Sequence, residues 1–383
     1  MTSAPQPASK PTKKREWMGQ FWLGCNMPAW LRLATKNYCT VNPLFIPAAL
    51  ITTGVSMGHS VLQFLQESLY GSRLDRTPIT HPPLFIIGHW RTGTTLLHEL
   101  LALDARHNFP STSACLEPNH FLLTDSLTRT IFPWLLPRER PMDGMKVDWN
   151  KPQEDEFALC LMGAPSPYLT IAFPNNAPKD TDALDLDGLK PRDLALWKRK
   201  FVGFLKRLTY RDPRRLVLKS PTHSCRIPTL LELFPDAQFV HIVRNPYVVY
   251  PSTVNLWKSL YDVQGLQFPT YRGLEEHVFS THTHLYERIE QGKKLIPKGN
   301  FHELRYENLV ADPVGELRKM YETLGMGGFD EYRPRLEEYL KANADYKTNR
   351  WPPMGDELKA EIARRWAGVI ERYGYAPPGS LLG

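Results

Sequence analysis

Arg91, Thr94 and Thr95 are spaced so that they could hold an anion at the start of a helix. The apolar run Leu84 to Ile87 before them is typical of a buried parallel strand. Gly88 to Gly93 can form a tight turn, and the leucines after Thr94 have helical spacing. A helix that starts after such a turn directs backbone N–H groups and the positive end of its dipole at one point. With an arginine fork and two hydroxyls added, the stretch predicts an anion-binding site.

The loop differs from that of the nucleotide triphosphatases, which have lysine directly after the second glycine, where this chain has Thr94. The stretch PLFIIGHWRTGTT instead resembles the 5′-phosphosulfate loop of sulfotransferases that use 3′-phosphoadenosine 5′-phosphosulfate (PAPS). It departs from that pattern at Trp90, where proline is frequent. The resemblance implies that the following residues bind the donor: Arg91, Thr92, Gly93, Thr94 and Thr95.

Two later strand ends carry further cations. In LVLKSPTH, Lys219 ends a predicted strand and can reach the same crevice as Arg91. In FVHIVRNPYVVYPS, Arg244 ends another strand and Ser252 follows in the next helix. This spacing matches the family's 3′-phosphate signature, and an arginine fork with a hydroxyl suits a phosphate dianion. Because ATP has no 3′-phosphate, the resemblance implies PAPS as the donor.

A fourth segment, LRYENLVADP, is similar to a motif of the same family. We interpret it as structural: Asp312-Pro313 is a helix start, and Glu307 holds the last strand or a basic residue of the core. The four segments cover the chain from Pro83 to about Leu324.

The general base is open among several groups, because a hydroxyl acceptor needs a carboxylate or imidazole within hydrogen-bond reach. The resemblance favours Glu117, which follows the first helix as the catalytic glutamate of bacterial and tyrosyl-protein members does. His223, beside Lys219, is the main alternative, since cytosolic members use histidine. Glu154 and Glu156 could start a helix, clamp a basic residue or act as the base. His120 could cap or line the loop.

The alternation of strands and helices predicts an α/β fold, a P-loop-like, mostly parallel sheet flanked by helices. Strands are predicted at 84–87, 216–218, 238–243 and 301–305, and helices at 198–208, 224–234, 247–260, 317–324 and 357–372. We expect a disordered basic N-terminus (1–15), an N-terminal helical region (16–80) and a sulfotransferase domain (81–383). A helical insertion at about 105–210 would build the acceptor pocket. Aromatic candidates for its lining are Phe109, Phe121, Trp134, Trp149 and Tyr168.

The segment 44–65 raises the question of a membrane. No Asp, Glu, Lys or Arg occurs from Asn37 to Gln66. Its apolar residues nevertheless share one helical face, and threonines, serines and glutamines crowd the other. Because a true span is apolar all round, we expect a helix packed on the domain or lying at a surface. The chain would then be at most peripherally attached to a membrane.

The net charge of +7 suits an anionic ligand, membrane or polynucleotide, and the five cysteines lack the spacing of a zinc site or disulfide framework. Together these features predict a cytoplasmic, possibly membrane-associated sulfotransferase that takes PAPS as cosubstrate, needs no metal and binds no nucleic acid. Its acceptor would be the hydroxyl of an apolar or aromatic-bearing small molecule or lipid. The alternatives are a P-loop kinase and a non-catalytic nucleotide-binding interaction protein.

Overall fold

The computed structural model describes residues 20–131, 148–178, 180–344 and 353–377. The predicted basic terminus at 1–15 and the predicted pocket residue Trp134 lie outside these ranges.

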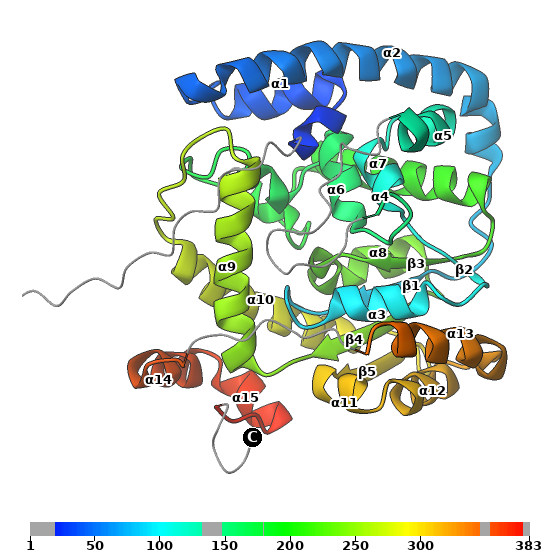
Figure 1. Cartoon of the computed structure of the whole chain (residues 1–383), viewed down its shortest axis with the longest axis vertical. Helices are drawn as coiled ribbons and strands as arrows, with labels where there is room; N and C mark the ends of the chain where they lie inside the picture. Colours follow the sequence, from blue (N-terminus) through cyan, green and yellow to red (C-terminus); the bar gives the residue numbers. More distant parts are fainter. Residues whose placement is uncertain (1–19, 132–147, 179, 345–352, 378–383) are drawn as a thin grey trace, which may run out of the picture.

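A five-stranded sheet of parallel strands lies at the centre of the described chain (Figure 1). Its strands are β1 (Leu84–Ile87), β2 (His107–Asn108), β3 (Arg215–Lys219), β4 (Gln238–Val243) and β5 (Phe301–Arg305), in the order β2-β3-β1-β4-β5. The predicted α/β fold is confirmed. The short strand β2 was not predicted.

Alternate strand residues point into two separate cores, one on each face of the sheet. Leu84 and Ile86 pack with α3 (Thr94–Leu101), α12 (Pro313–Thr323) and α13 (Phe329–Ala342). Phe85 and Ile87 pack on the other face with α7 (Pro191–Arg211), α8 (Ile227–Leu233), α9 (Pro246–Gln264) and α10 (Leu274–Lys293). Because both faces are covered, β1 and the central residues of β3 and β4 are largely apolar and buried, which is why these strands could be predicted, whereas β5 is a mixed, mostly half-buried strand.

The segment between β2 and β3 is mainly helical, as expected. It contains α4 (Thr112–Leu116), α5 (Phe121–Ile131), α6 (Asp155–Leu161), the 3-10 turns η4 (Pro167–Ile171) and η5 (Thr181–Ala183), and α7. Two predicted helices differ in the structure. The predicted helix 224–234 starts later, as α8, because its first two residues belong to the 3-10 turn η6 (Pro221–Cys225). The predicted helix 357–372 divides at Trp366 into α14 (Asp356–Arg365) and α15 (Ala367–Tyr373). After β5, α11 (Tyr306–Ala311) leads into α12, which Asp312 caps.

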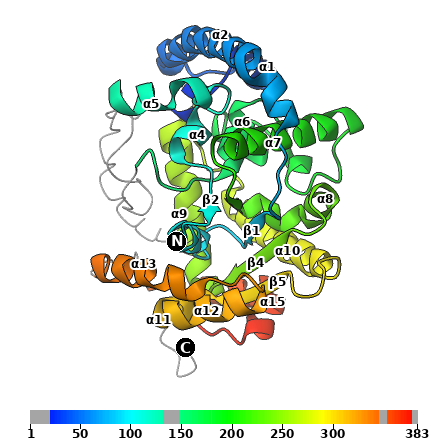
Figure 2. The same ribbon diagram turned by 90° about the vertical axis from the view of Figure 1, so that its right-hand side faces the viewer.

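The N-terminal part forms a separate layer. It consists of η1 (Phe21–Gly24), α1 (Met27–Lys36), η2 (Pro43–Phe45) and the long helix α2 (Ile46–Arg76). Figure 2 shows α1 and α2 at the opposite end of the molecule from α11, α12 and α13. The helix α2 is a surface helix, but its polar residues Thr52, Ser56 and Gln66 face the protein. Most of its large apolar residues are exposed, although Leu74 is buried.

Candidate active site

Three neighbouring strands end at the same edge of the sheet and bring the predicted cations together. The loop 88–93 follows β1, Lys219 is the last residue of β3, and Arg244 follows β4 directly. Because β1 lies between β3 and β4 and all three are parallel, these groups converge where ligands of such sheets bind.

The loop has a conformation that its glycines make possible. Gly93 has a φ of 101°, and a Cβ at this position would collide with the ring of Tyr306. The Gly88 N–H donates to Ser224 Oγ at 2.8 Å, and Thr92 Oγ1 donates to the His89 carbonyl at 2.8 Å. The turn is therefore held on both sides, and the first N–H groups of α3 are left to face a ligand.

The predicted 5′- and 3′-binding residues are in contact with each other. Arg91 Nε donates to Ser252 Oγ at 2.9 Å. Arg244 Nη1 donates to the Arg91 carbonyl at 3.1 Å, and its guanidinium lies 4.0 Å from the centroid of the Tyr306 ring. Stacking on that ring holds the Arg244 fork in one orientation. Two arginines and a serine hydroxyl are thus fixed beside the loop, a donor set that fits a ligand with two anionic groups.

Lys219 joins the loop to an acidic partner. Its Nζ lies 3.4 Å from Thr95 Oγ1 and 2.8 Å from Glu154 Oε1, and the residue is 2% exposed. The other Glu154 oxygen accepts from the Tyr168 hydroxyl at 2.6 Å, and that hydroxyl accepts from Trp90 Nε1 at 2.8 Å. Burial, and then the Glu154 carboxylate, raise the pKa of Tyr168 well above its usual value, so its hydroxyl remains a donor. A carboxylate and an ammonium therefore lie beside the loop.

The other two acids of the QEDE stretch anchor the segment after β3. Asp155 pairs with His223 Nε2 at 2.9 Å, and both side chains are fully buried. Burial would raise the pKa of Asp155, but the His223 imidazole and hydrogen bonds lower it below its usual value. Glu156 binds Arg226 at 2.5 Å and accepts from Thr222 Oγ1 at 2.9 Å.

The Asp155 and Glu156 pairings clamp the turn that follows Lys219. The ring of His223 packs against Phe85, on the face of the sheet that holds the larger core. Of the three consecutive acids, Glu154 pairs with Lys219, whereas Asp155 and Glu156 pair with His223 and Arg226.

Glu117 belongs to another network. Its carboxylate accepts hydrogen bonds from Thr124 Oγ1 and Thr128 Oγ1, each at 2.8 Å at the shortest. Burial raises the pKa of Glu117, although these hydroxyls oppose the shift. His120 donates to or accepts from the same Thr124 at 2.9 Å and stacks on His59 of α2, and burial with His59 lowers its pKa to about 3. The hydrogen bonds of Glu117 among the described residues thus lead to α5, and its assignment as the base stays a prediction.

Sequence reasoning gave no role in the site to Trp90 or Tyr306. Trp90 replaces the frequent proline and supplies the indole N–H that Tyr168 accepts. Tyr306 fills the space under Gly93 and supports Arg244. Two features of the sequence could have indicated these residues: the departure from the family pattern at Trp90, and the tyrosine of the YENL segment, which is Tyr306.

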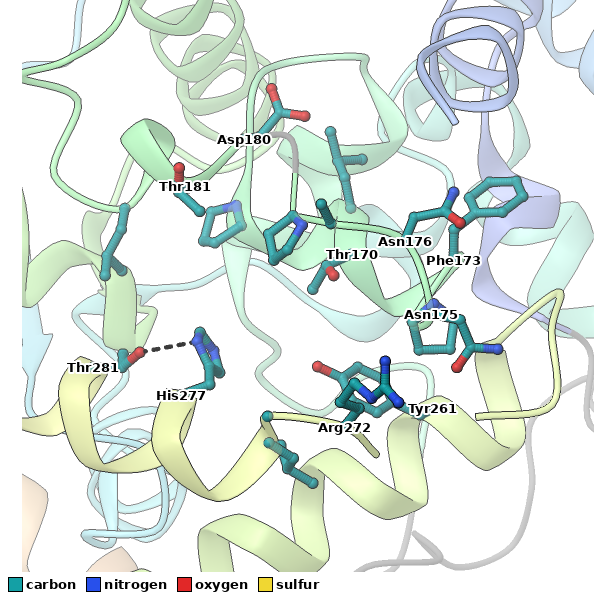
Figure 3. Close-up of a pocket in the computed structure, with 18 of the residues that line it drawn as sticks. Thr170, Phe173, Asn175, Asn176, Asp180, Thr181, Tyr261, Arg272, His277 and Thr281 are labelled. Atoms are coloured by element: carbon teal, nitrogen blue, oxygen red, sulfur yellow. Dashed lines mark hydrogen bonds between the residues drawn. The ribbon is translucent and has the colours of Figure 1, made fainter. Parts of the chain in front are cut away.

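A cavity of about 1000 Å³ lies between the segment 167–185 and the helices α9 and α10 (Figure 3). Phe173, Tyr261, Arg272 and His277 are among its lining residues, and His277 Nδ1 lies 3.4 Å from Thr281 Oγ1. Pro167 and Leu169, on either side of Tyr168, also line it. The cavity and the Glu154–Tyr168 pair therefore share the turn η4. Of the predicted lining residues, Phe121 and Tyr168 are instead part of the core, and Phe109 and Trp149 do not line this cavity.

Comparison with known proteins agrees with this geometry. The model of a sulfotransferase family matches residues 82–331. The chain is 47% identical over 368 residues to omega-hydroxy-beta-dihydromenaquinone-9 sulfotransferase Stf3 of Mycobacterium bovis and of Mycobacterium tuberculosis, covering 96% of this chain and 94% of each relative.

Two solved structures share the fold at 18% sequence identity. Sulfotransferase STF1 from Mycobacterium tuberculosis H37Rv has a TM-score of 0.63, with 89% of this chain and 90% of that chain covered. Sulfotransferase STF9 from Mycobacterium avium has a TM-score of 0.64, with 92% and 97% covered. The fold is therefore that of sulfotransferases along most of the chain.

Proposed function

The chain belongs to the sulfotransferase family, and from this we propose that it transfers a sulfuryl group from PAPS to the hydroxyl of a lipid-like acceptor. The observation that carries the proposal is the contact of Arg91 with Ser252 and Arg244 beside the loop, which suits a donor with two anionic ends. The kinase alternative loses its support, because the matched family transfers sulfuryl groups and the loop has no lysine after Gly93.

The donor would be held at both ends. The N–H groups of Gly93 to Thr95 and the hydroxyls of Thr94 and Thr95 would surround a 5′-phosphosulfate, with Arg91 beside them, while the Thr92 hydroxyl holds the turn through the His89 carbonyl. Arg244 and Ser252 would hold the 3′-phosphate. PAPS would supply the activated sulfuryl group. The residues contribute positioning and the stabilisation of negative charge, and the described residues contain no metal-binding group of three or more His, Cys, Asp or Glu.

We assign the general base to Glu154. In the transfer, the acceptor oxygen forms a bond to sulfur, the bond from sulfur to the phosphate oxygen breaks, and the hydroxyl proton must leave. Glu154 could take that proton, because it lies beside Lys219, which contacts the loop residue Thr95. Lys219 can then turn from the carboxylate toward the charge that develops on the transferred group. Asp155, Glu156 and His223 act as positioning residues that hold the segment after β3.

The acceptor assignment rests on the relatives and on the cavity. The relatives are named for a menaquinone-derived substrate, a lipid-like molecule that carries a hydroxyl. A cavity of about 1000 Å³ next to the turn that carries Tyr168 could hold part of such a molecule. All five cysteines are free, which supports a reducing, cytoplasmic location, and we propose that contact with a membrane through 44–65 gives access to the acceptor.

Calorimetry with adenosine 3′,5′-bisphosphate and adenosine 5′-phosphate tests the donor site. Arg244→Ala removes a charged donor, worth about 1.5–3 kcal/mol, and should weaken the bisphosphate by about tenfold or more. The monophosphate should bind nearly as before. Arg318→Ala is a matched control, because Arg318 also stacks on an aromatic ring, that of Phe329, at 4.6 Å but lies on α12. Equal losses for both ligands would refute the assignment of the 3′-phosphate site.

A further inference from the structure

The long helix α2 is attached to the protein by its polar side. Thr53 Oγ1 accepts from the Trp30 indole at 2.9 Å, and Gln63 Oε1 accepts from Asn26 at 2.7 Å. Gln66 is fully buried, donates to the Asn119 carbonyl and accepts from the Leu122 N–H, both at 2.9 Å. This arrangement inverts the usual one, in which a surface helix of a globular protein turns its apolar stripe to the core.

The apolar side of the same helix is exposed over most of its length. We define the α2 apolar face as six residues that are each 55–74% exposed, namely Leu44 of the preceding turn η2 and Leu50, Met57, Val61, Phe64 and Leu69 of α2. Among the described residues, the helical segment Pro43–Arg76 is long and apolar enough to cross a membrane, judged by length and composition alone. Little of its most apolar stretch is buried inside the protein. A contiguous face of this kind marks an interaction site.

We propose that the α2 apolar face lies in the interface of an anionic membrane, with the axis of α2 along the membrane surface and the protein on its polar side. The helix is about 46 Å long at 1.5 Å per residue, and it contains no Asp, Glu, Lys or Arg from Ile46 to Gln66. An interfacial helix is held by its apolar area and by nearby cations.

The basic residues of the chain favour anionic lipid as the partner. Exposed Arg73 and Arg76 lie in the last turn of α2, with the exposed Asp75 between them. In the sequence, three further cations, Lys13, Lys14 and Arg15, precede this layer. The net charge of +7 would oppose the pairing of two copies through this face, whereas it is attracted to an anionic bilayer.

The helix contacts also favour a helix that lies on the membrane over one that crosses it. A span would have to leave the protein, which breaks the bonds of Thr53, Gln63 and Gln66 and places these polar groups in hydrocarbon. The Arg207–Glu67 ion pair at 2.8 Å would break as well. The inference does not depend on sulfuryl transfer. It does give the face a use, because Asn37 at the end of α1 lines the large cavity, so this layer borders the candidate acceptor site.

Flotation of the purified full chain with vesicles tests the inference. We compare phosphatidylcholine vesicles with vesicles that also contain phosphatidylglycerol. The wild-type chain should float with the anionic vesicles and be released by high salt or alkaline carbonate. The double variant Leu50→Glu/Phe64→Glu should lose about a hundredfold or more in partitioning, because two apolar side chains no longer enter the lipid.

The control Leu295→Glu/Val310→Glu changes two residues that are 57% and 50% exposed but lie outside α2. It should float as the wild type does. Affinity for adenosine 3′,5′-bisphosphate reports folding and should be equal in all three proteins.

Absence of flotation by the wild-type chain would overturn the inference, as would equal loss in both double variants. Retention through carbonate would show a span. A stable dimer in light scattering that Leu50→Glu/Phe64→Glu abolishes, with no vesicle binding, would assign the face to a second copy. Failure of sulfuryl transfer with intact flotation would refute the proposed function alone.

Discussion

Glu154→Gln separates the candidate bases most sharply. The substitution keeps the size of the side chain and an oxygen that can accept from the Tyr168 hydroxyl, now 2.6 Å from the carboxylate. It removes the negative charge that lies 2.8 Å from Lys219 Nζ. It also removes the ability to accept the proton of the acceptor hydroxyl.

The contacts set the expected size of both effects. Lys219 is 2% exposed, so the loss of its partner leaves a buried ammonium and should lower the free energy of unfolding by about 3–5 kcal/mol. Turnover should fall by roughly a hundredfold or more, the usual contribution of a general base. Affinity for PAPS should be kept or increased, because the anionic donor can take the place of the lost carboxylate beside Lys219.

For Glu154→Gln, Glu156→Gln and Glu117→Gln, turnover is measured at saturating PAPS, and PAPS affinity is measured separately by titration. The Glu156 variant is the matched control, since it also breaks a buried ion pair, that of Glu156 with Arg226. It should lower the free energy of unfolding but leave the turnover of the donor-bound enzyme largely unchanged. Glu117→Gln should change turnover by less than about threefold, because its carboxylate is bound by threonines on α5. Near-normal turnover in Glu154→Gln with collapse in Glu117→Gln would refute our assignment and restore Glu117.

Two further changes test the structure around the site. Gly93→Ala should lower the free energy of unfolding by about 3 kcal/mol and abolish nucleotide binding, because Gly93 has a φ of 101° and a Cβ there would meet the Tyr306 ring. The control Gly273→Ala has a φ of 75° but open space around the Cβ, so it should lower the free energy of unfolding by about 1 kcal/mol and leave nucleotide binding intact. Urea unfolding and nucleotide titration measure the two effects. Burial alone would raise the pKa of Asp104, but hydrogen bonds from the Arg106 guanidinium lower it from 3.8 to about 2. The Asp104–Arg106 pair therefore stabilises the folded protein fully above about pH 4, and this stabilisation is lost as the pH falls through about 2. Asp104→Asn should therefore flatten the dependence of the unfolding free energy on pH in that window, and an unchanged slope would contradict the role of this pair.

The strands β1, β3 and β4 could be predicted because both of their faces are buried, which makes them largely apolar runs. The limits of β1, β4 and β5 match the predicted runs, and β3 extends one residue beyond its prediction at each end. β2 was missed because it is a polar pair, His107–Asn108, that carries no apolar signal. Ser224 and Cys225 were predicted as the start of a helix but lie in the turn η6, and Pro228 in the first turn of α8 delays the start of the helix.

The residues of the candidate site could be predicted where they belong to a recognisable sequence motif. Arg91, Arg244 and Ser252 stand at spacings that match the family pattern, Lys219 was predicted from its place at a strand end, and the structure brings these residues to the same loop. The pairing of Glu154 with Lys219 joins residues 65 positions apart, so only the fold could select it from three consecutive acids. The inward-facing polar side of α2 was equally hidden, because periodicity shows that two faces differ but not which face the protein covers.

The transfer itself is the most direct test of the central claim. The purified chain is incubated with sulfur-labelled PAPS and a hydroxylated menaquinone-type lipid, and the labelled lipid and adenosine 3′,5′-bisphosphate are quantified together. We predict one bisphosphate released for each sulfated lipid, no dependence on added divalent metal, and loss of both products in Glu154→Gln. Transfer from ATP instead of PAPS, or release of bisphosphate with no sulfated product from any hydroxylated lipid, would contradict the account.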